Sequence, residues 1–145
     1  YLDLGYYAAQ NGVPFTFSSN LLHALRAAIK HVDWERRFNG LVELSTWLRG
    51  QLTEMGLQLI GTGMRTSPAV VTIALPPAMN STSIGKLIEE AGYLLSYNSE
   101  YLHQKNWIQI CLMGECTREK TVSLLNALNR VCFKRKREAE VAGKL

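Results

Sequence analysis

The stretch that decides the fold is Trp107-Ile108-Gln109-Ile110-Cys111-Leu112-Met113-Gly114-Glu115-Cys116-Thr117-Arg118-Glu119-Lys120. Its first half is short, mostly apolar and closed by a glycine, which is typical of a buried strand over 107–113. Thr117 can then cap a helix. Apolar residues follow at helical spacing and predict one buried side: Val122, Leu125, Leu128 and Cys132. The sequence therefore predicts a strand, a glycine turn and a closing helix.

The other predicted strands lie upstream of this stretch. Ala69–Leu75 is β-branched and nearly continuous, so we expect it to be a central strand, with the closing strand paired beside it. Leu57–Ile60 is a shorter candidate that ends at Gly61 and Gly63, and Tyr93–Leu95 is another. The order of the strands outside the closing pair is not determined by the sequence.

The helices are marked by capping residues. Residues 18–20 can cap a helix with one apolar side, and Asp33 can cap a longer one that reaches Met55 and stops at Gly56. Residues 80–83 can cap a third that ends at Gly92. Residues 1–14 hold at most one helical turn. The predicted fold is α+β: a small, mostly antiparallel sheet with helices packed on one face, preceded by a helical pair.

The bulk properties are those of an ordinary soluble domain. The chain has 145 residues, 47% of them hydrophobic and 19% charged. Its apolar runs fall short of the roughly 20 residues of a membrane span. The start at Tyr1 lacks methionine and the features of a signal peptide, so we expect a fragment of a longer, cytoplasmic protein. Three cysteines make no even disulfide framework and fit a reducing compartment.

Local chemistry alone supports no active site. Cys111 and Cys132 are predicted to be small core residues, and the adjacent carboxylates Glu89 and Glu90 to be solvated on a helix. The histidines stand at no metal-ligand spacing to the cysteines. We therefore expect no metal site.

The net charge of +4 includes the run Lys134–Arg137 near the C-terminus. Cations suit the C-terminal end of a helix, and we expect a solvated helix end there. The alternative is a non-catalytic interaction module that binds protein or nucleic acid through this cluster. Nucleic acid is the less favoured partner because only Phe133, at the edge of the run, offers an aromatic ring to stack on bases.

Two segments resemble a known family. Pro14-Phe15-Thr16-Phe17-Ser18-Ser19-Asn20-Leu21-Leu22-His23-Ala24-Leu25-Arg26 is similar to the segment of class V aminotransferases in which an aromatic and threonine pair precedes a helix. The strand, glycine and helix quoted first resemble the end of the small C-terminal domain of the same family. The match extends from about Tyr1 to Val131.

The resemblance implies a domain of a larger enzyme. Class V aminotransferases are fold-type I enzymes that use pyridoxal phosphate (PLP) to move an amino group between an amino acid and a 2-oxo acid. Residues 1–16 would lead in from a large upstream domain, and 17–145 would form the small domain. The Schiff-base lysine would lie upstream, because the lysines here stand in polar contexts. The fragment alone would be inactive, and the whole enzyme a homodimer.

Two site residues follow from the resemblance. Thr16 matches a threonine that reaches the cofactor phosphate of the neighbouring subunit; otherwise Thr16 only shapes the turn before the helix. Gln109 stands where the family has an arginine that binds the substrate carboxylate. A glutamine offers neutral donors only, so carboxylate binding would weaken by roughly 1.5–3 kcal/mol.

Other departures point to an altered substrate or to lost catalysis. Residues 96–102 are bulky where the family has a glycine-rich loop, and they either reshape a substrate entrance or form an ordinary surface loop. Replacement cations could come from Arg65, Lys105 or Arg118. Cys116, just before a helix, is the one plausible thiol for a desulfurase reaction, since a helix N-terminus lowers a thiol pKa.

Overall fold

The computed structural model describes residues 3–10, 18–61, 63 and 66–142, the last nine by their backbone alone. Within these residues there are six helices and three strands. In chain order they are α1 (Leu4–Ala9), α2 (Ser19–His31), α3 (Trp34–Glu54), β1 (Gln58–Ile60), β2 (Val70–Ala74), α4 (Ser81–Glu90), α5 (Glu100–Lys105), β3 (Trp107–Cys111) and α6 (Arg118–Ala142). The chain forms two compact units, Tyr1–Arg37 and Phe38–Leu145. The boundary predicted at residue 16 stays a prediction.

The first unit holds the start of the helical pair. α1 is the single turn of helix that the sequence allows, and Asp3 caps it by accepting a hydrogen bond from the Tyr6 amide. The Ser18 hydroxyl accepts a hydrogen bond from the Leu21 amide at the start of α2, as predicted. The joint between α2 and α3 is only two residues long, and the Asp33 carboxylate caps α3 through the Arg36 amide.

The sheet has three antiparallel strands in the order β1-β2-β3. β3 pairs with the β-branched strand β2 over its whole length, so that Thr72 lies opposite Gln109 and Ile73 opposite Ile108. The prediction that the closing strand lies beside the long one is confirmed. The fold class is confirmed as well.

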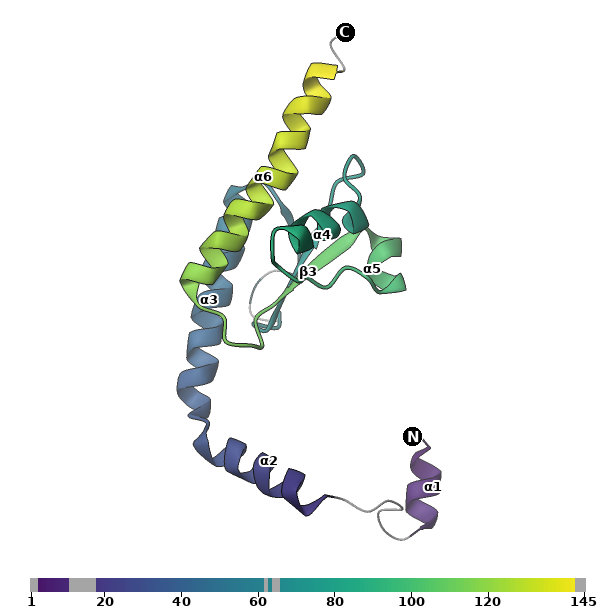
Figure 1. The fold of residues 1–145 in the computed structure, drawn as a ribbon, viewed down its shortest axis with the longest axis vertical. Coiled ribbons are helices and arrows are strands. Elements are labelled where there is room, and N and C mark those ends of the chain that lie inside the picture. The colour runs from purple at the N-terminus through teal and green to yellow at the C-terminus, as the bar shows by residue number, and fades with distance from the viewer. Residues whose placement is uncertain (1–2, 11–17, 62, 64–65, 143–145) are drawn as a thin grey trace. The chain divides into compact units, whose positions relative to one another are not determined.

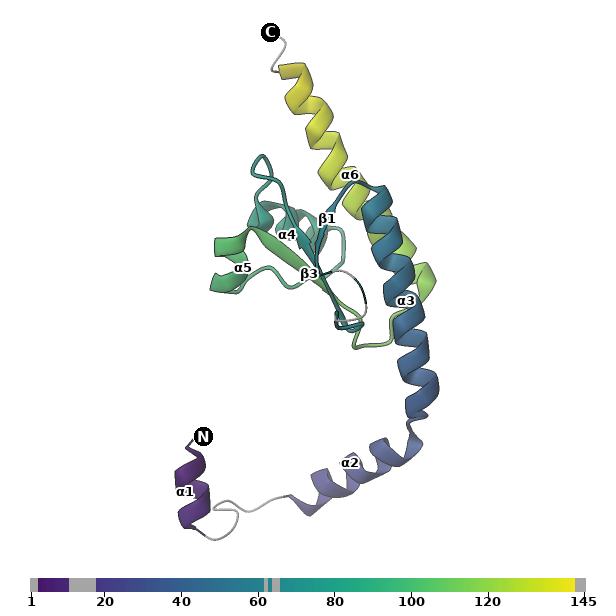
Figure 2. The same cartoon turned by 180° about the vertical axis from the view of Figure 1, so that it is seen from behind.

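Alternation along the strands places the core on one face of the sheet. Val71 and Ile73 of β2 and Ile108 and Ile110 of β3 are buried, and they share one hydrophobic cluster with residues of α3, α4 and α6. Figures 1 and 2 show α3 and α6 running alongside each other next to the sheet. Between them the Arg118 guanidinium lies 4.6 Å from the centre of the Trp47 ring, a cation–π contact.

Two predictions about the region before β3 were wrong. Tyr93–Leu95 is not a strand; instead a single bridge joins Ser96 to Gln109. Residues 100–105, which the sequence left in a loop, form α5, with Ser99 capping it by accepting a hydrogen bond from the Leu102 amide.

Two predictions about core residues also need correction. Cys111 is exposed, since it follows buried Ile110 and the strand alternation turns it to the other face. Val122 is exposed, whereas Leu124 and Thr121 beside it are buried, because the buried face of α6 is rotated by about one residue from the predicted one. Leu125, Leu128 and Cys132 are buried as expected.

None of the helices in the described part of the chain is both long and apolar enough to cross a membrane.

Candidate functional site

Gln109 lies in the middle of β3, on the face of the sheet away from α3, α4 and α6. Its neighbours Ile108 and Ile110 are buried in the core, so the glutamine side chain projects from the opposite face and is half-buried. Its Nε2 donates a hydrogen bond to the Thr72 hydroxyl on β2, at 3.1 Å. This contact follows from the register, which sets the two residues opposite each other.

Ser96 extends the sheet beyond β3 at this position. Its amide donates to the Gln109 carbonyl at 3.0 Å, and the Gln109 amide donates back at 2.9 Å. Leu95 and Tyr97 on either side of Ser96 are buried, whereas Ser96 itself is exposed. The Gln109 backbone is therefore hydrogen-bonded on the strand edge that β2 leaves open.

Tyr97 anchors the segment after the bridge. Its ring packs against Gly85 of α4, where a Cβ would clash with three ring carbons. Its hydroxyl donates a short hydrogen bond to the Glu89 carboxylate. That bond raises the pKa of Tyr97, burial and the negative charge of Glu89 raise it further, and a hydrogen bond with Asn98 acts in the opposite direction. Glu89 and Glu90 are both exposed, as predicted, but Glu89 has this structural partner.

These residues surround an open pocket of about 370 Å³ at the edge of β3. It is lined by Leu95, Ser96, Tyr97, Asn98, Ser99, Leu102 and Gln109. The residues come from the bridge segment, the start of α5 and the closing strand. The predicted substrate residue Gln109 thus lines a pocket together with the 96–102 segment that the sequence singled out as a departure from the family.

Asn106 fixes the start of β3 and was not singled out from the sequence. It adopts a left-handed conformation (φ 57°) and ends α5. Its Oδ1 accepts from the Ser81 amide at 2.8 Å, and its Nδ2 donates to the Met79 carbonyl at 2.8 Å. Asparagine is common at left-handed helix ends, but that signal needs a recognised helix before it, and α5 was not predicted.

Arg49 holds the turn between β1 and β2 and was also missed. Its guanidinium donates to the carbonyls of Gly61, Ser67 and Val70 at 3.1–3.3 Å. Burial lowers the pKa of this arginine. An arginine on a helix carries no sequence signal for contacts with a turn more than ten residues later.

The three proposed replacement cations differ in what the structure shows. Arg65 lies outside the described residues. Arg118 stacks on Trp47 on the helical side of the sheet, whereas Gln109 projects from the other side. Lys105 is exposed at the end of α5 and is not among the residues that line the pocket. The structure therefore brings neither Arg118 nor Lys105 into this pocket.

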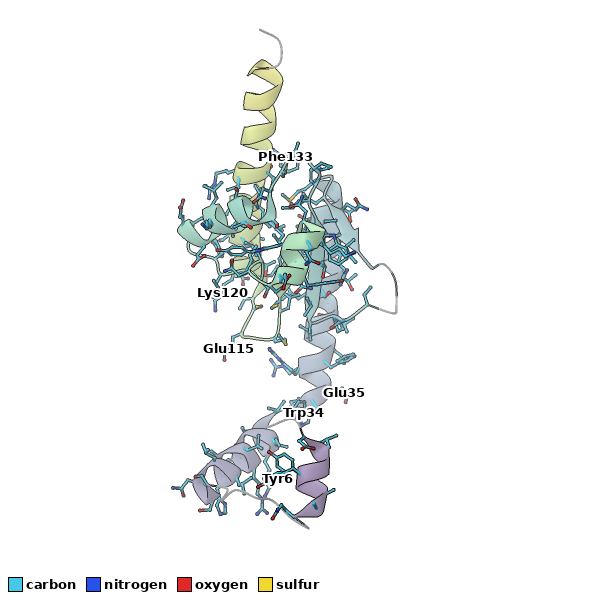
Figure 3. All side chains as sticks on the ribbon, turned by 90° about the vertical axis from the view of Figure 1, so that its right-hand side faces the viewer. Tyr6, Trp34, Glu35, Glu115, Lys120 and Phe133 are labelled. Atoms are coloured by element: carbon cyan, nitrogen blue, oxygen red, sulfur yellow. The ribbon has the colours of Figure 1, made fainter. Side chains whose placement is uncertain are left out.

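Lysine side chains are described at four positions, Lys30, Lys86, Lys105 and Lys120, and all four are exposed. Lys120, for example, donates to the Glu115 carbonyl at 3.2 Å in the turn before α6, where Figure 3 labels both residues. An exposed lysine lacks the enclosed setting that depresses its pKa and makes it a nucleophile.

The cysteines differ in their surroundings. Cys116 is half-buried just before α6, and its Sγ lies 3.9 Å from the Cys111 carbonyl oxygen as a weak donor. Cys132 is fully buried, and burial raises the pKa of its thiol to about 11. Among the described residues no group of histidine, cysteine, aspartate or glutamate could hold a metal ion.

Two predicted site elements are outside what the structure describes. Thr16 lies in the gap between residues 10 and 18. The backbone of Lys134–Arg137 lies on α6, but the side chains of this run are not described. The predicted roles of both therefore stay predictions.

Comparisons with known proteins give structural matches only. No protein-family model matches the chain, and no curated protein matches it. Among solved structures, a ureidoglycine–glyoxylate aminotransferase from Bacillus subtilis matches with a TM-score of 0.71 and 24% identity, covering 83% of this chain and 32% of that one. A NifS-like protein matches with a TM-score of 0.58 and 15% identity, covering 68% and 28%.

An aspartate aminotransferase of subgroup IV from Thermus thermophilus matches with a TM-score of 0.54 and 20% identity, covering 65% of this chain and 26% of that one. The chain thus spans about a third or less of each of these three structures. At these identities the likeness concerns the fold. The chain has the fold of the C-terminal portion of class V aminotransferases.

Proposed function

We propose that this chain is the small C-terminal domain of a longer PLP-dependent, aminotransferase-like enzyme that moves an amino group between an amino acid and a 2-oxo acid. The observation that carries the proposal is the position of Gln109 on the strand that closes the shared fold, beside an open pocket. The matched structures support it, because each is about three to four times as long as the part that this chain covers.

The described residues do not fit covalent attachment of PLP. The cofactor needs a lysine with a depressed pKa in an enclosed site, and the four described lysines are exposed. We therefore assign the Schiff-base lysine to an upstream domain. In the proposed homodimer, Thr16 would reach the cofactor phosphate of the neighbouring subunit, as the family resemblance implies.

The role of this chain would be to form one wall of the substrate site. α3, α4 and α6 cover one face of the sheet, and Gln109 and Thr72 project from the other. A second domain that packs over this open face would enclose the pocket and exclude water from it. The substrate group bound by Gln109 would then be held by neutral hydrogen bonds.

The test uses the longer protein, purified with the upstream region of its gene. The expected result is a visible absorption band of a PLP Schiff base that borohydride removes, and loss of amino-acid turnover when residues 38–145 are deleted. A longer protein that binds no PLP at all would overturn the proposal.

A Cys116→Ser variant separates transamination from a desulfurase reaction. Transamination needs no thiol, so the variant should keep its turnover of amino acids, whereas a desulfurase would lose its sulfur transfer. Measuring both products in the same preparation distinguishes the two reactions.

A further inference from the structure

The pocket beside Gln109 carries no formal charge on its walls. Its seven lining residues are all described, and they offer one carboxamide edge from Gln109, another from Asn98, two serine hydroxyls and the apolar surfaces of Leu95 and Leu102. No cation lines the pocket, so a bound carboxylate would lose its water without gaining a charged partner. This arrangement disfavours an anionic ligand.

The Gln109 side chain has hydrogen-bonding capacity to spare. Its Nε2 uses one hydrogen for the Thr72 hydroxyl, which leaves the second hydrogen and Oε1 without a partner among the described residues. The contact with Thr72 restrains the rotation of the amide. The second N–H and Oε1 remain as one donor and one acceptor for a ligand.

That pair is complementary to another carboxamide and not to a carboxylate. A carboxamide supplies an N–H for Oε1 and a carbonyl oxygen for Nε2, so two hydrogen bonds form. A carboxylate supplies acceptors only, so one bond forms and its second oxygen faces Oε1 of Gln109. No described cation lines the pocket to offset that repulsion.

We propose that this pocket binds an uncharged carboxamide-type group, –CO–NH–, and discriminates against a carboxylate. As a substrate subsite the proposal rests on the proposed function, but the binding preference belongs to this chain and needs no cofactor. An experiment can therefore contradict the binding preference without contradicting the proposed function, and the reverse.

The experiment is a titration of the ¹⁵N-labelled 145-residue chain with acetamide and with acetate at matched ionic strength, followed by NMR. These probes have nearly the same shape and differ in charge and in the N–H group. Acetamide should bind more tightly than acetate by roughly tenfold, the difference expected for one lost charge-neutral bond plus repulsion. The shifts should map to Ser96, Asn98 and the Gln109 side-chain amide.

Three variants sharpen the result. Gln109→Leu keeps the volume and removes both hydrogen bonds, so acetamide binding should fall by about fivefold or more. Gln109→Arg supplies a charged fork and should reverse the preference toward acetate. Gln58→Arg makes the same substitution on β1, at a residue outside the pocket, and should leave the preference of the wild-type chain unchanged.

The result that overturns the proposal needs no variant. If the wild-type chain binds acetate as tightly as acetamide, or if neither probe shifts the lining residues, the pocket is not a carboxamide site. Equal acetamide binding by wild type and Gln109→Leu would overturn it too. In each case a PLP band in the longer protein would leave the proposed domain role standing.

Discussion

The Tyr97 ring packs directly against Gly85 of α4, with no room for a side chain at the glycine. This contact locks the segment that carries Ser96 and Asn98 onto the helical layer. The tyrosine hydroxyl then reaches Glu89, one turn of α4 further along. The pocket wall is therefore positioned by α4, which lies far from β3 in the sequence.

Gly85→Ala should destabilise the fold despite its better helix propensity. The methyl group would overlap the Tyr97 ring, and overpacking of this kind costs about 1–3 kcal/mol. Gly50→Ala in α3 is the matched control, because nothing lies within 4 Å of its added Cβ. That variant should gain about 0.5–1 kcal/mol. Urea unfolding of both variants checks the prediction, and equal gains at the two positions would contradict the packing.

Two substitutions of Asn106 should separate the stability that its side-chain hydrogen bonds contribute from the cost of its left-handed backbone. Asn106→Gly keeps the left-handed conformation but orphans the Ser81 amide and the Met79 carbonyl, at a cost of about 1–3 kcal/mol. Asn106→Ala should cost about 1 kcal/mol more, since alanine is strained at φ 57°. Asn126→Ala on the exposed side of α6 is the control and should change stability by less than about 0.5 kcal/mol. Thermal and urea unfolding would show whether glycine and alanine differ at position 106.

The central part of the fold could be predicted from the sequence because its signals are local and strong. The β-branched run of β2 and the apolar run of β3 mark buried strands, and a capping residue marks the start of each long helix. Pairing β3 with β2 buries both runs under the helices. These features can be recognised from neighbouring residues, without knowledge of long-range tertiary contacts.

The pocket could be predicted only in part. Gln109 was found through its place in a family pattern, and residues 96–102 through their bulk. α5 was missed because it has six residues and a single buried one, Leu102, so it shows no periodicity. Cys111 was misplaced because it lies inside an apolar run, whereas strand alternation turns every second residue to the open face. Such errors arise where tertiary contacts determine which side of a strand or short helix is buried.

Buried Cys132 should make stability fall at high pH. Burial raises the pKa of its thiol from 9.0 to about 11 in the folded chain. The folded state thus favours the neutral thiol. Its contribution is fully present below pH 9.0 and is lost as the pH rises through about 11. The full loss is on the order of 3 kcal/mol.

The matched variant for this effect is Cys132→Ala, which removes the thiol and leaves a small cavity. Its unfolding free energy should be lower at neutral pH but should fall less steeply than that of the wild type between pH 9 and 11. Comparing the two slopes by urea unfolding removes the contribution of other groups that titrate there. If the unfolding free energies of the two proteins fell equally steeply with pH, burial would not raise the pKa of the Cys132 thiol.

If the proposed function holds, an arginine at position 109 should broaden the amino-acid substrates of the proposed longer enzyme. A guanidinium offers a bidentate, charge-assisted contact to a carboxylate, and the Gln109 amide offers one neutral bond. The gain of roughly 1.5–3 kcal/mol corresponds to about a 10- to 150-fold increase in kcat/KM for substrates with a free carboxylate there. Gln109→Lys, a point charge without the fork, should gain less. Steady-state kinetics on a panel of amino acids and the corresponding amides provides the check. A Gln109→Arg enzyme that gains turnover with amides but not with acids would show that the pocket does not meet the carboxylate.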